Sequence, residues 1–170
     1  SFGAQTACTA TEQAAIDDAI ASGAVLIAAA GNQGAEAGNF SPANCDNVIT
    51  VAASTRQGGE TFYTNFGNNI SLSAPGGNTD NEINGIYSTT NNGLDAPDQD
   101  SFELVSGTSF AAPMVSGAAA LIKAVNPQLS PLDIRFILET SSRSFPAGTT
   151  DGFQDCIPER CGAGLLDTAK

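Results

Sequence analysis

The sequence of 170 residues contains no histidine, and this absence limits the chemistry that the chain can perform alone. Histidine is the commonest general base in enzymes, so that role cannot come from an imidazole of this chain. Lysine and arginine total 6, against 18 aspartates and glutamates, for a formal net charge of −12. Nucleic acids and anionic membranes are bound through basic side chains, so we expect no nucleic acid and no membrane as partners. The acidity is instead typical of a soluble surface.

Long apolar runs and a leader sequence are also lacking. No stretch approaches the roughly 18 consecutive apolar residues of a membrane span. The longest apolar stretch, residues 23–31, has the length of a strand. The chain opens on SFGAQ, without an initiator Met or a signal-peptide pattern, and this opening resembles the interior of a domain. We therefore expect an N-terminal part of a longer protein to precede it.

Four cysteines are present, namely Cys8, Cys45, Cys156 and Cys161, and four cysteines allow three pairings. Zinc sites usually combine CxxC pairs, often with histidine, and this sequence has neither. We therefore predict disulfides and an oxidising compartment. Cys156 and Cys161 are close enough in sequence to close a small loop.

The order of the apolar segments predicts an α/β fold. A helix is expected between Thr11, as its N-cap, and Gly23, which would end it in a left-handed conformation. Strands follow over residues 24–29, 48–54 and 70–75, and the first two are apolar enough to be covered on both faces. Strands that alternate with helices indicate a mainly parallel sheet flanked by helices. One edge of this sheet would be bare and prone to aggregate unless another segment paired with it.

The second half of the chain predicts a surface excursion and two helices. Residues 76–104 are rich in Asn, Asp and Gly and should hold one or two short strands, one of them over residues 85–90. The next helix, over residues 109–125, is built of small residues and is thin enough to cross the centre of a domain. Pro113 should be tolerated in its first turn. A last helix should begin at Ser130 as N-cap, with Pro131 in the first turn and Asp133 completing a capping box.

Ser109 stands where a loop turns into a helix, in the stretch SGTSFAAP. The positive end of the helix macrodipole would favour negative charge that develops near its oxygen. The alternative is that Ser109 is a helix N-cap and nothing more. GTSFA lacks the second glycine of the G-x-S-x-G elbow of α/β-hydrolases, and no G-x-x-x-x-G-K-[ST] phosphate loop occurs in the chain.

Five ordered segments resemble the subtilases, the subtilisin-like serine proteases. GTSFAAPMVSGAAAL is similar to the family's active-site serine motif, and AAAGNQG is similar to its oxyanion-hole segment. SPANCDNVITVAA, then YTNFG followed by SAPGG, and finally GAGLLDTAK match further segments in the family's order. The resemblance implies that residues 1–170 are the C-terminal portion of a single subtilisin-like peptidase domain.

The resemblance also assigns roles to residues of this sequence. Ser109 matches the nucleophile, and Asn32 matches the oxyanion-hole side chain, with the backbone N–H of Ser109 as the second donor. The remaining assignments concern substrate binding: an edge strand over residues 1–3 with backbone bonds from Ser1 and Gly3, and pocket walls from Ala29 and Gly31. Phe40 would lie near the base of that pocket. Disulfide-bearing secreted members imply that Cys8 pairs with Cys45 and Cys156 with Cys161.

The family's triad needs an Asp and a His that precede the serine. The resemblance therefore implies a partner, the N-terminal portion of the same protease with the Asp and the His, and protein or peptide substrates. This chain alone should be inactive. No cofactor is needed for the chemistry, and structural calcium is expected from the acidity and the family habit, without assigned ligands.

The function predicted is a secreted, extracellular serine endopeptidase that acts by acyl transfer through Ser109. One alternative is a catalytically silent subtilase-like module with a binding or structural role, although intact Ser109 and Asn32 argue against it. The other is a Ser-Glu-Asp carboxyl peptidase, whose Glu base fits a chain without histidine. Those proteins, however, place Asp where Asn32 stands.

Overall fold

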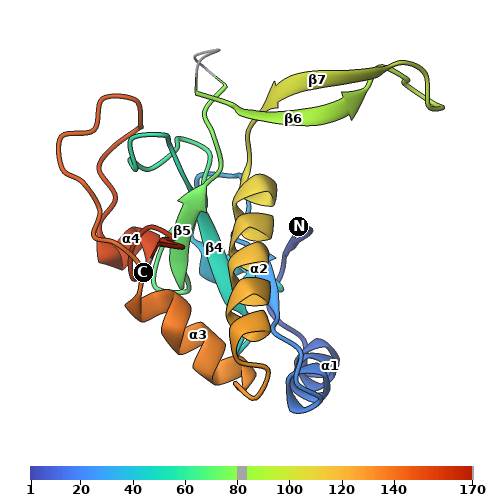
Figure 1. The fold of residues 1–170 in the computed structure, drawn as a ribbon, viewed down its shortest axis with the longest axis vertical. Coiled ribbons are helices and arrows are strands. Elements are labelled where there is room, and N and C mark those ends of the chain that lie inside the picture. The colour runs from blue at the N-terminus through green and yellow to red at the C-terminus, as the bar shows by residue number, and fades with distance from the viewer. Residues whose placement is uncertain (80–83, 170) are drawn as a thin grey trace.

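A three-stranded parallel sheet is the centre of the fold. The computed structural model describes residues 1–79 and 84–169. The strands β2 (Ile27–Ala29), β4 (Ile49–Ser54) and β5 (Leu72–Pro75) lie in the order β2-β4-β5. Helix α2 (Thr108–Val125) lies against this sheet, and α3 (Pro131–Thr140) packs beside α2 (Figure 1). The predicted α/β class with a mainly parallel sheet is confirmed.

Helix α1 (Ala10–Ala21) covers the other face of the sheet. Its buried Ile16 packs with Ala28 and Val48, whereas the neighbouring strand residues Ala29 and Ile49 belong to the core beneath α2. Successive side chains of a strand point to opposite faces, so this division places the two helices on opposite sides. All six residues of β4 are buried, as expected of a strand that is covered on both faces.

The shorter elements lie at the borders of this core. Strands β1 (Ala4–Gln5) and β3 (Phe40–Ser41) pair antiparallel, and η1 (Ala37–Asn39) is a 3₁₀ turn directly before β3. Strands β6 (Ile86–Asn91) and β7 (Asp100–Val105) form a hairpin that projects from the body (Figure 1). This hairpin confirms the predicted surface excursion. Helix α4 (Pro158–Cys161) lies near the C-terminal end.

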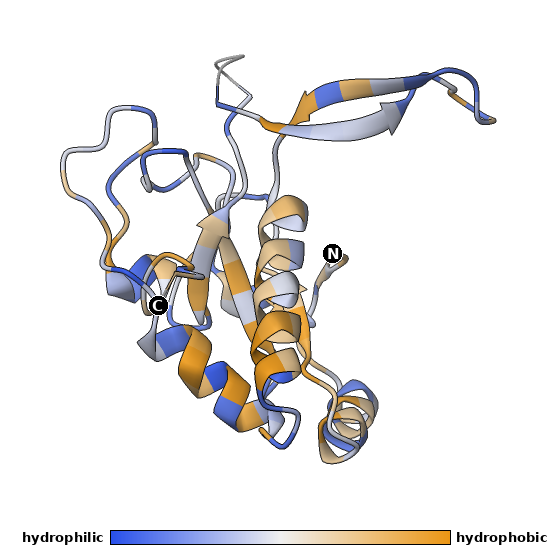
Figure 2. Ribbon diagram, in the orientation of Figure 1, coloured by the Kyte–Doolittle hydropathy of each residue, from blue (hydrophilic) through white to orange (hydrophobic). Residues whose placement is uncertain are grey.

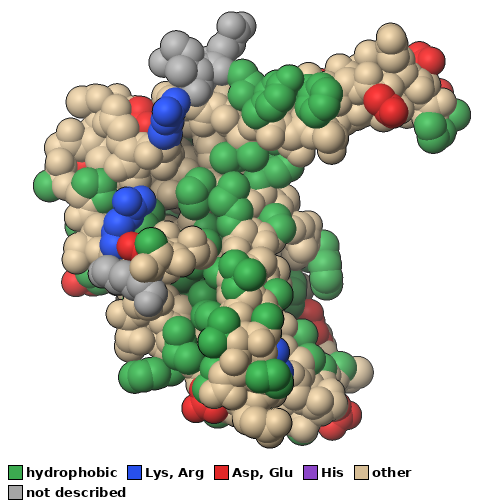
Figure 3. Space-filling model, in the orientation of Figure 1, with side chains coloured by type: hydrophobic (Ala, Val, Ile, Leu, Met, Phe, Trp, Pro, Cys, Tyr) green, Lys and Arg blue, Asp and Glu red, His purple; other side chains and the backbone are tan. Residues whose placement is uncertain are grey.

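Helix α2 has one buried face and one exposed face. By length and composition it could cross a membrane, but its buried residues pack into the core around β4 and β5, so it is a core helix here. On the other face Leu121 is 63% exposed and Val125 is 89% exposed. Figure 2 shows hydrophobic residues along the α2 ribbon, and Figure 3 shows hydrophobic side chains on the surface over this helix. We expected α2 to be surrounded by the rest of the domain. Among the described residues, only one of its faces is covered.

The helix termini test the capping predictions. In α3, Ser130 Oγ accepts from Asp133 N at 3.2 Å and Ser130 N donates to Asp133 Oδ2 at 2.9 Å, which confirms the predicted capping box. The Ser130 hydroxyl, which donates to Asp133 Oδ2 at 2.6 Å, and the Ser130 N–H together lower the pKa of Asp133. The predicted cap of α1 is wrong, because Thr9 rather than Thr11 caps it and accepts from Glu12 N at 3.2 Å. Gly23 has the predicted positive φ, +94°.

The two edges of the parallel sheet differ. The edge of β5 is bonded to a C-terminal segment, since Ala163 N donates to Ser71 O at 2.9 Å and Leu166 N donates to Ser73 O at 2.8 Å. Among residues 1–79 and 84–169, β2 pairs only with β4, so its outer edge is open. β2 is also shorter than the strand predicted over residues 24–29, because β4 begins at Ile49, opposite Ile27.

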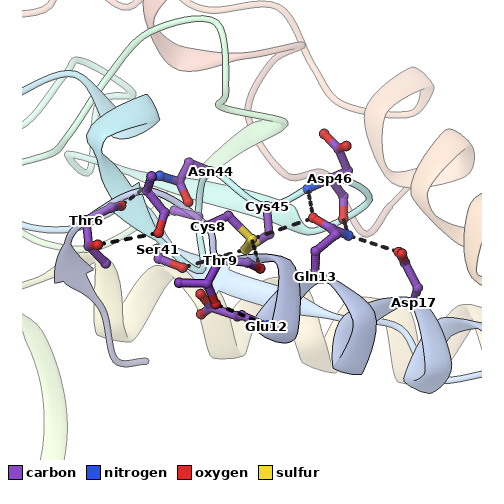
Figure 4. The surroundings of a disulfide bond; sticks show 12 residues. Thr6, Cys8, Thr9, Glu12, Gln13, Asp17, Ser41, Asn44, Cys45 and Asp46 are labelled. Carbon is purple, nitrogen blue, oxygen red and sulfur yellow. Dashed lines mark hydrogen bonds between the residues drawn. A yellow bond between two sulfur atoms is a disulfide. The ribbon is translucent and has the colours of Figure 1, made fainter.

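Both disulfides have the pairing that the family resemblance implies. Cys8 is bonded to Cys45 across a sequence separation of 37, and Cys156 to Cys161 across a separation of 5. The first joins the start of α1 to the loop before β4 (Figure 4). Beside it, Gln13 Oε1 accepts from Asp46 N at 2.8 Å, which adds a second tie between the same segments.

Removing the Cys8–Cys45 disulfide should cost more stability than removing the other one. A longer loop loses more chain entropy on closure, so the double substitution Cys8→Ala/Cys45→Ala should lower the free energy of unfolding by about 4 kcal/mol. The matched control Cys156→Ala/Cys161→Ala should lower it by about 2 kcal/mol. Urea denaturation of both variants measures the difference, and equal losses would contradict this ordering.

Candidate active site

The head of α2 meets the carboxyl end of β2 at a cavity of about 120 Å³. This is the end of a parallel strand at which α/β proteins commonly bind ligands. The structure brings the six predicted catalytic and substrate-binding residues to this cavity: Ser1, Gly3, Ala29, Gly31, Asn32 and Ser109. Phe40, expected near the base of the pocket, is buried and lines the same cavity.

Ser109 is the second residue of α2 and does not cap it. The N-cap is Gly107, and Thr108 is the first helical residue, so the alternative role of Ser109 as an N-cap is wrong. Its backbone N–H belongs to the first turn, where N–H groups have no acceptor within the helix. The hydroxyl and this N–H therefore stand together at the positive end of the helix macrodipole.

The orientation of the Asn32 amide is set by Thr108. Asn32 Oδ1 accepts from Thr108 N at 2.9 Å and from Thr108 Oγ1 at 2.8 Å. Thr108 is fully buried, and its Oγ1 also accepts from Gly31 N at 3.2 Å. Because the oxygen of the amide is held by two donors, Asn32 presents its Nδ2 as the free donor group. Thr108 was missed as a positioning residue, although it stands inside the serine motif.

Pro113 affects the site more than its position in the motif suggested. It is the sixth residue of α2, beyond the first turn, so its missing N–H leaves the carbonyl of Ser109 without the usual helical donor. Ser1 Oγ donates to Ser109 O instead, at 3.2 Å. The expectation that Pro113 lies in the first turn is therefore wrong. The effect of Pro113 is that the Ser109 carbonyl accepts from the Ser1 hydroxyl rather than from a helical N–H.

Residues 1–3 lie along the cavity but form no strand. The edge strand expected there begins only at Ala4, which pairs with Ser41 of β3. A Cβ on Gly3 would lie 3.1 Å from Ser41 O, so this backbone approaches β3 closely. Only Ala4 and Gln5 of this N-terminal segment pair with β3, so the edge strand expected over residues 1–3 is absent among the described residues.

No charged side chain lines the cavity among the described residues. No Glu or Asp side chain of residues 1–79 and 84–169 lies there, so neither a Glu base nor a His base lines the cavity. Among the described residues, the groups of three or more potential metal ligands are Cys8, Glu12, Cys45 and Glu60, Cys156, Cys161. Each contains a disulfide and therefore lacks the free thiolates that bind metals.

The fold and the site together define a class, a parallel α/β domain with a serine at a helix head and an amide side chain beside it. The model of the Subtilase family matches residues 1–164, and the chain belongs to this family. The chain is similar to a protease of Pseudoalteromonas arctica whose structure is solved, with 40% identity and a TM-score of 0.88 over 99% of this chain and 48% of that one.

Two bacterial relatives are named as extracellular proteases. An extracellular protease of Xanthomonas campestris is 37% identical over 98% of this chain and 26% of its own length. An extracellular basic protease of Dichelobacter nodosus is 33% identical over 98% of this chain and 26% of its own length. The chain thus spans about a quarter of the length of these curated relatives.

Proposed function

We propose that residues 1–170 are the C-terminal portion of the peptidase domain of a secreted serine endopeptidase. Ser109 Oγ would attack the carbonyl carbon of a peptide bond while its proton passes to a histidine base. The peptide nitrogen would leave with that proton, giving an acyl group on Ser109 that water then hydrolyses. Asn32 Nδ2 and the N–H of Ser109 would stabilise the oxyanion of each tetrahedral intermediate.

The observation that carries this proposal is the fixed amide of Asn32. Two hydrogen bonds from Thr108 hold its oxygen, at 2.9 Å and 2.8 Å. The opposite end of the amide, a donor, is therefore available in the cavity that Ser109 also lines. Oxyanion stabilisation requires donors that are oriented before the reaction begins. A helix cap or a silent module has no need of this arrangement.

The base would come from an N-terminal portion of the same protease. The chain contains no histidine, and no charged side chain lines the cavity among the described residues. The open edge of β2 and the exposed outer face of α2 offer surfaces on which such a portion could pack. Without it, this chain should be inactive, because the oxyanion hole alone supplies only residual catalysis.

The proposed location is extracellular. The disulfides Cys8–Cys45 and Cys156–Cys161 persist in an oxidising compartment, and the bacterial relatives carry the word extracellular in their names. The proposed chemistry needs no cofactor. Calcium would be structural, and it stays a prediction without assigned ligands.

A fluorophosphonate probe tests this function in the natural preparation that contains the chain. The probe should label Ser109 when the histidine-bearing portion is present, and an intact-mass spectrum should reveal that portion or its covalent continuation. The same preparation after heat denaturation is the control and should not be labelled. A folded preparation that holds the histidine and still fails to react would support the silent module instead.

A further inference from the structure

Asn65 contacts the loop of Asn32 on both sides of that residue. Its side chain is fully buried, and its Oδ1 accepts from Gln33 N at 2.9 Å and from Ala35 N at 3.1 Å. Its Nδ2 donates to Ala30 O at 2.9 Å. A single buried amide therefore binds backbone groups that precede and follow Asn32.

The turn at Gly31 fits closely against Asn65. Asn65 N donates to Gly31 O at 2.9 Å. Gly31 has φ +104°, and a Cβ at this position would collide with the amide of Asn65. The backbone conformation that aims Asn32 at the cavity thus depends on a glycine and on the side chain that lies over it.

Tyr63, two residues earlier, contacts the segment after β5, which is hydrogen-bonded to the residue before α2. Its hydroxyl lies 2.9 Å from Gly76 O and 2.6 Å from Gly77 O. Gly76 O also accepts from Gly107 N at 2.9 Å, and Gly107 directly precedes α2. Burial disfavours the charged phenolate and raises the pKa of Tyr63 to about 12.

Tyr63 also contacts the loop of Asn32 through its backbone, since Gly34 N donates to Tyr63 O at 2.8 Å. Neither Tyr63 nor Asn65 lines the cavity, so both act through other residues. We propose that Tyr63 and Asn65 are positioning residues of the oxyanion hole: Asn65 fixes the loop of Asn32, and Tyr63 fixes the junction that carries the N–H of Ser109. This inference rests on the proposed function.

The test uses Tyr63→Phe and Asn65→Ala in the assembled protease. A displaced donor weakens transition-state binding, so kcat should fall about 10-fold in Tyr63→Phe and about 100-fold in Asn65→Ala, with KM within about twofold. Affinity for a peptide boronic acid, which forms a tetrahedral adduct with the serine, should fall by the same factors. Affinity for the product peptide should stay unchanged.

Two controls separate positioning from stability. Tyr87→Phe removes a hydroxyl from the exposed hairpin, where Tyr87 is 70% exposed, and should change neither kcat nor boronate affinity. Thr55→Val removes a buried hydroxyl that donates to Asp151 Oδ1 at 2.6 Å, away from the cavity, and should lower the Tm without changing kcat.

The outcomes are distinct. Unchanged kcat and boronate affinity in Tyr63→Phe would overturn the inference, even if Asn65→Ala failed to fold. So would a loss of kcat in Thr55→Val that matched the loss in Tyr63→Phe at equal Tm. An assembled, unsubstituted protease that neither cleaves peptides nor binds the boronic acid would overturn the proposed function itself.

Discussion

Replacing Ser109 by alanine in the assembled protease should lower kcat about 10⁶-fold, with KM for a peptide substrate within about twofold. This magnitude is the one known for the triad serine of subtilisin itself and is borrowed from it. The physical reason is that alanine has no hydroxyl to attack the carbonyl carbon, so the acyl-enzyme cannot form at this position. Asn32 and the helix N-terminus would still bind the substrate carbonyl, so residual catalysis above the water reaction should remain.

Ser106→Ala is the matched control for this substitution. Ser106 lies in the loop before α2, three positions before Ser109, and its hydroxyl lies 3.0 Å from Thr79 Oγ1. Initial rates with a chromogenic peptide should be nearly unchanged in Ser106→Ala. If Ser109→Ala retained a large part of the activity, the nucleophile would have to be another residue, and the acyl-transfer mechanism through Ser109 would be refuted.

Local sequence signals predicted the elements whose causes are themselves local. The capping box of Ser130 and Asp133 was readable because all its partners lie within three residues of one another. The positive φ of Gly23 was readable because a glycine after a helical pattern has few other uses. The cap of α1 was misplaced although Thr9 and Glu12 form a T-x-x-E pattern, the stronger of two competing signals.

Features that depend on contacts between distant segments could not be fully predicted from the sequence. The shortening of β2 depends on where β4 begins. A bare edge was predicted, but its position at β2 depends on the C-terminal segment that pairs with β5. Ser109 and Asn32 were assigned from motifs, because their chemistry restricts the residues around them. Thr108, Tyr63 and Asn65 could not be assigned to the site, since their importance comes from hydrogen bonds to residues roughly 10 to 80 positions away.

The substitution Asn32→Leu should lower kcat about 10²–10³-fold, equivalent to roughly 2.7–4 kcal/mol of transition-state stabilisation, the range known for the same donor in subtilisin. KM should change little, because the amide would bind the oxyanion more strongly than the ground-state carbonyl. Asn32→Asp should be at least as damaging at neutral pH. It keeps an acceptor for Thr108 N and Oγ1 but puts a second carboxylate oxygen where the donor stood.

Asn68→Ala, on the exposed surface, is the control and should leave both constants unchanged. Steady-state kinetics with one peptide substrate decides the matter. A raised KM with unchanged kcat would mean that Asn32 binds the substrate rather than the transition state, and the orientation that Thr108 imposes on the amide would then serve binding alone.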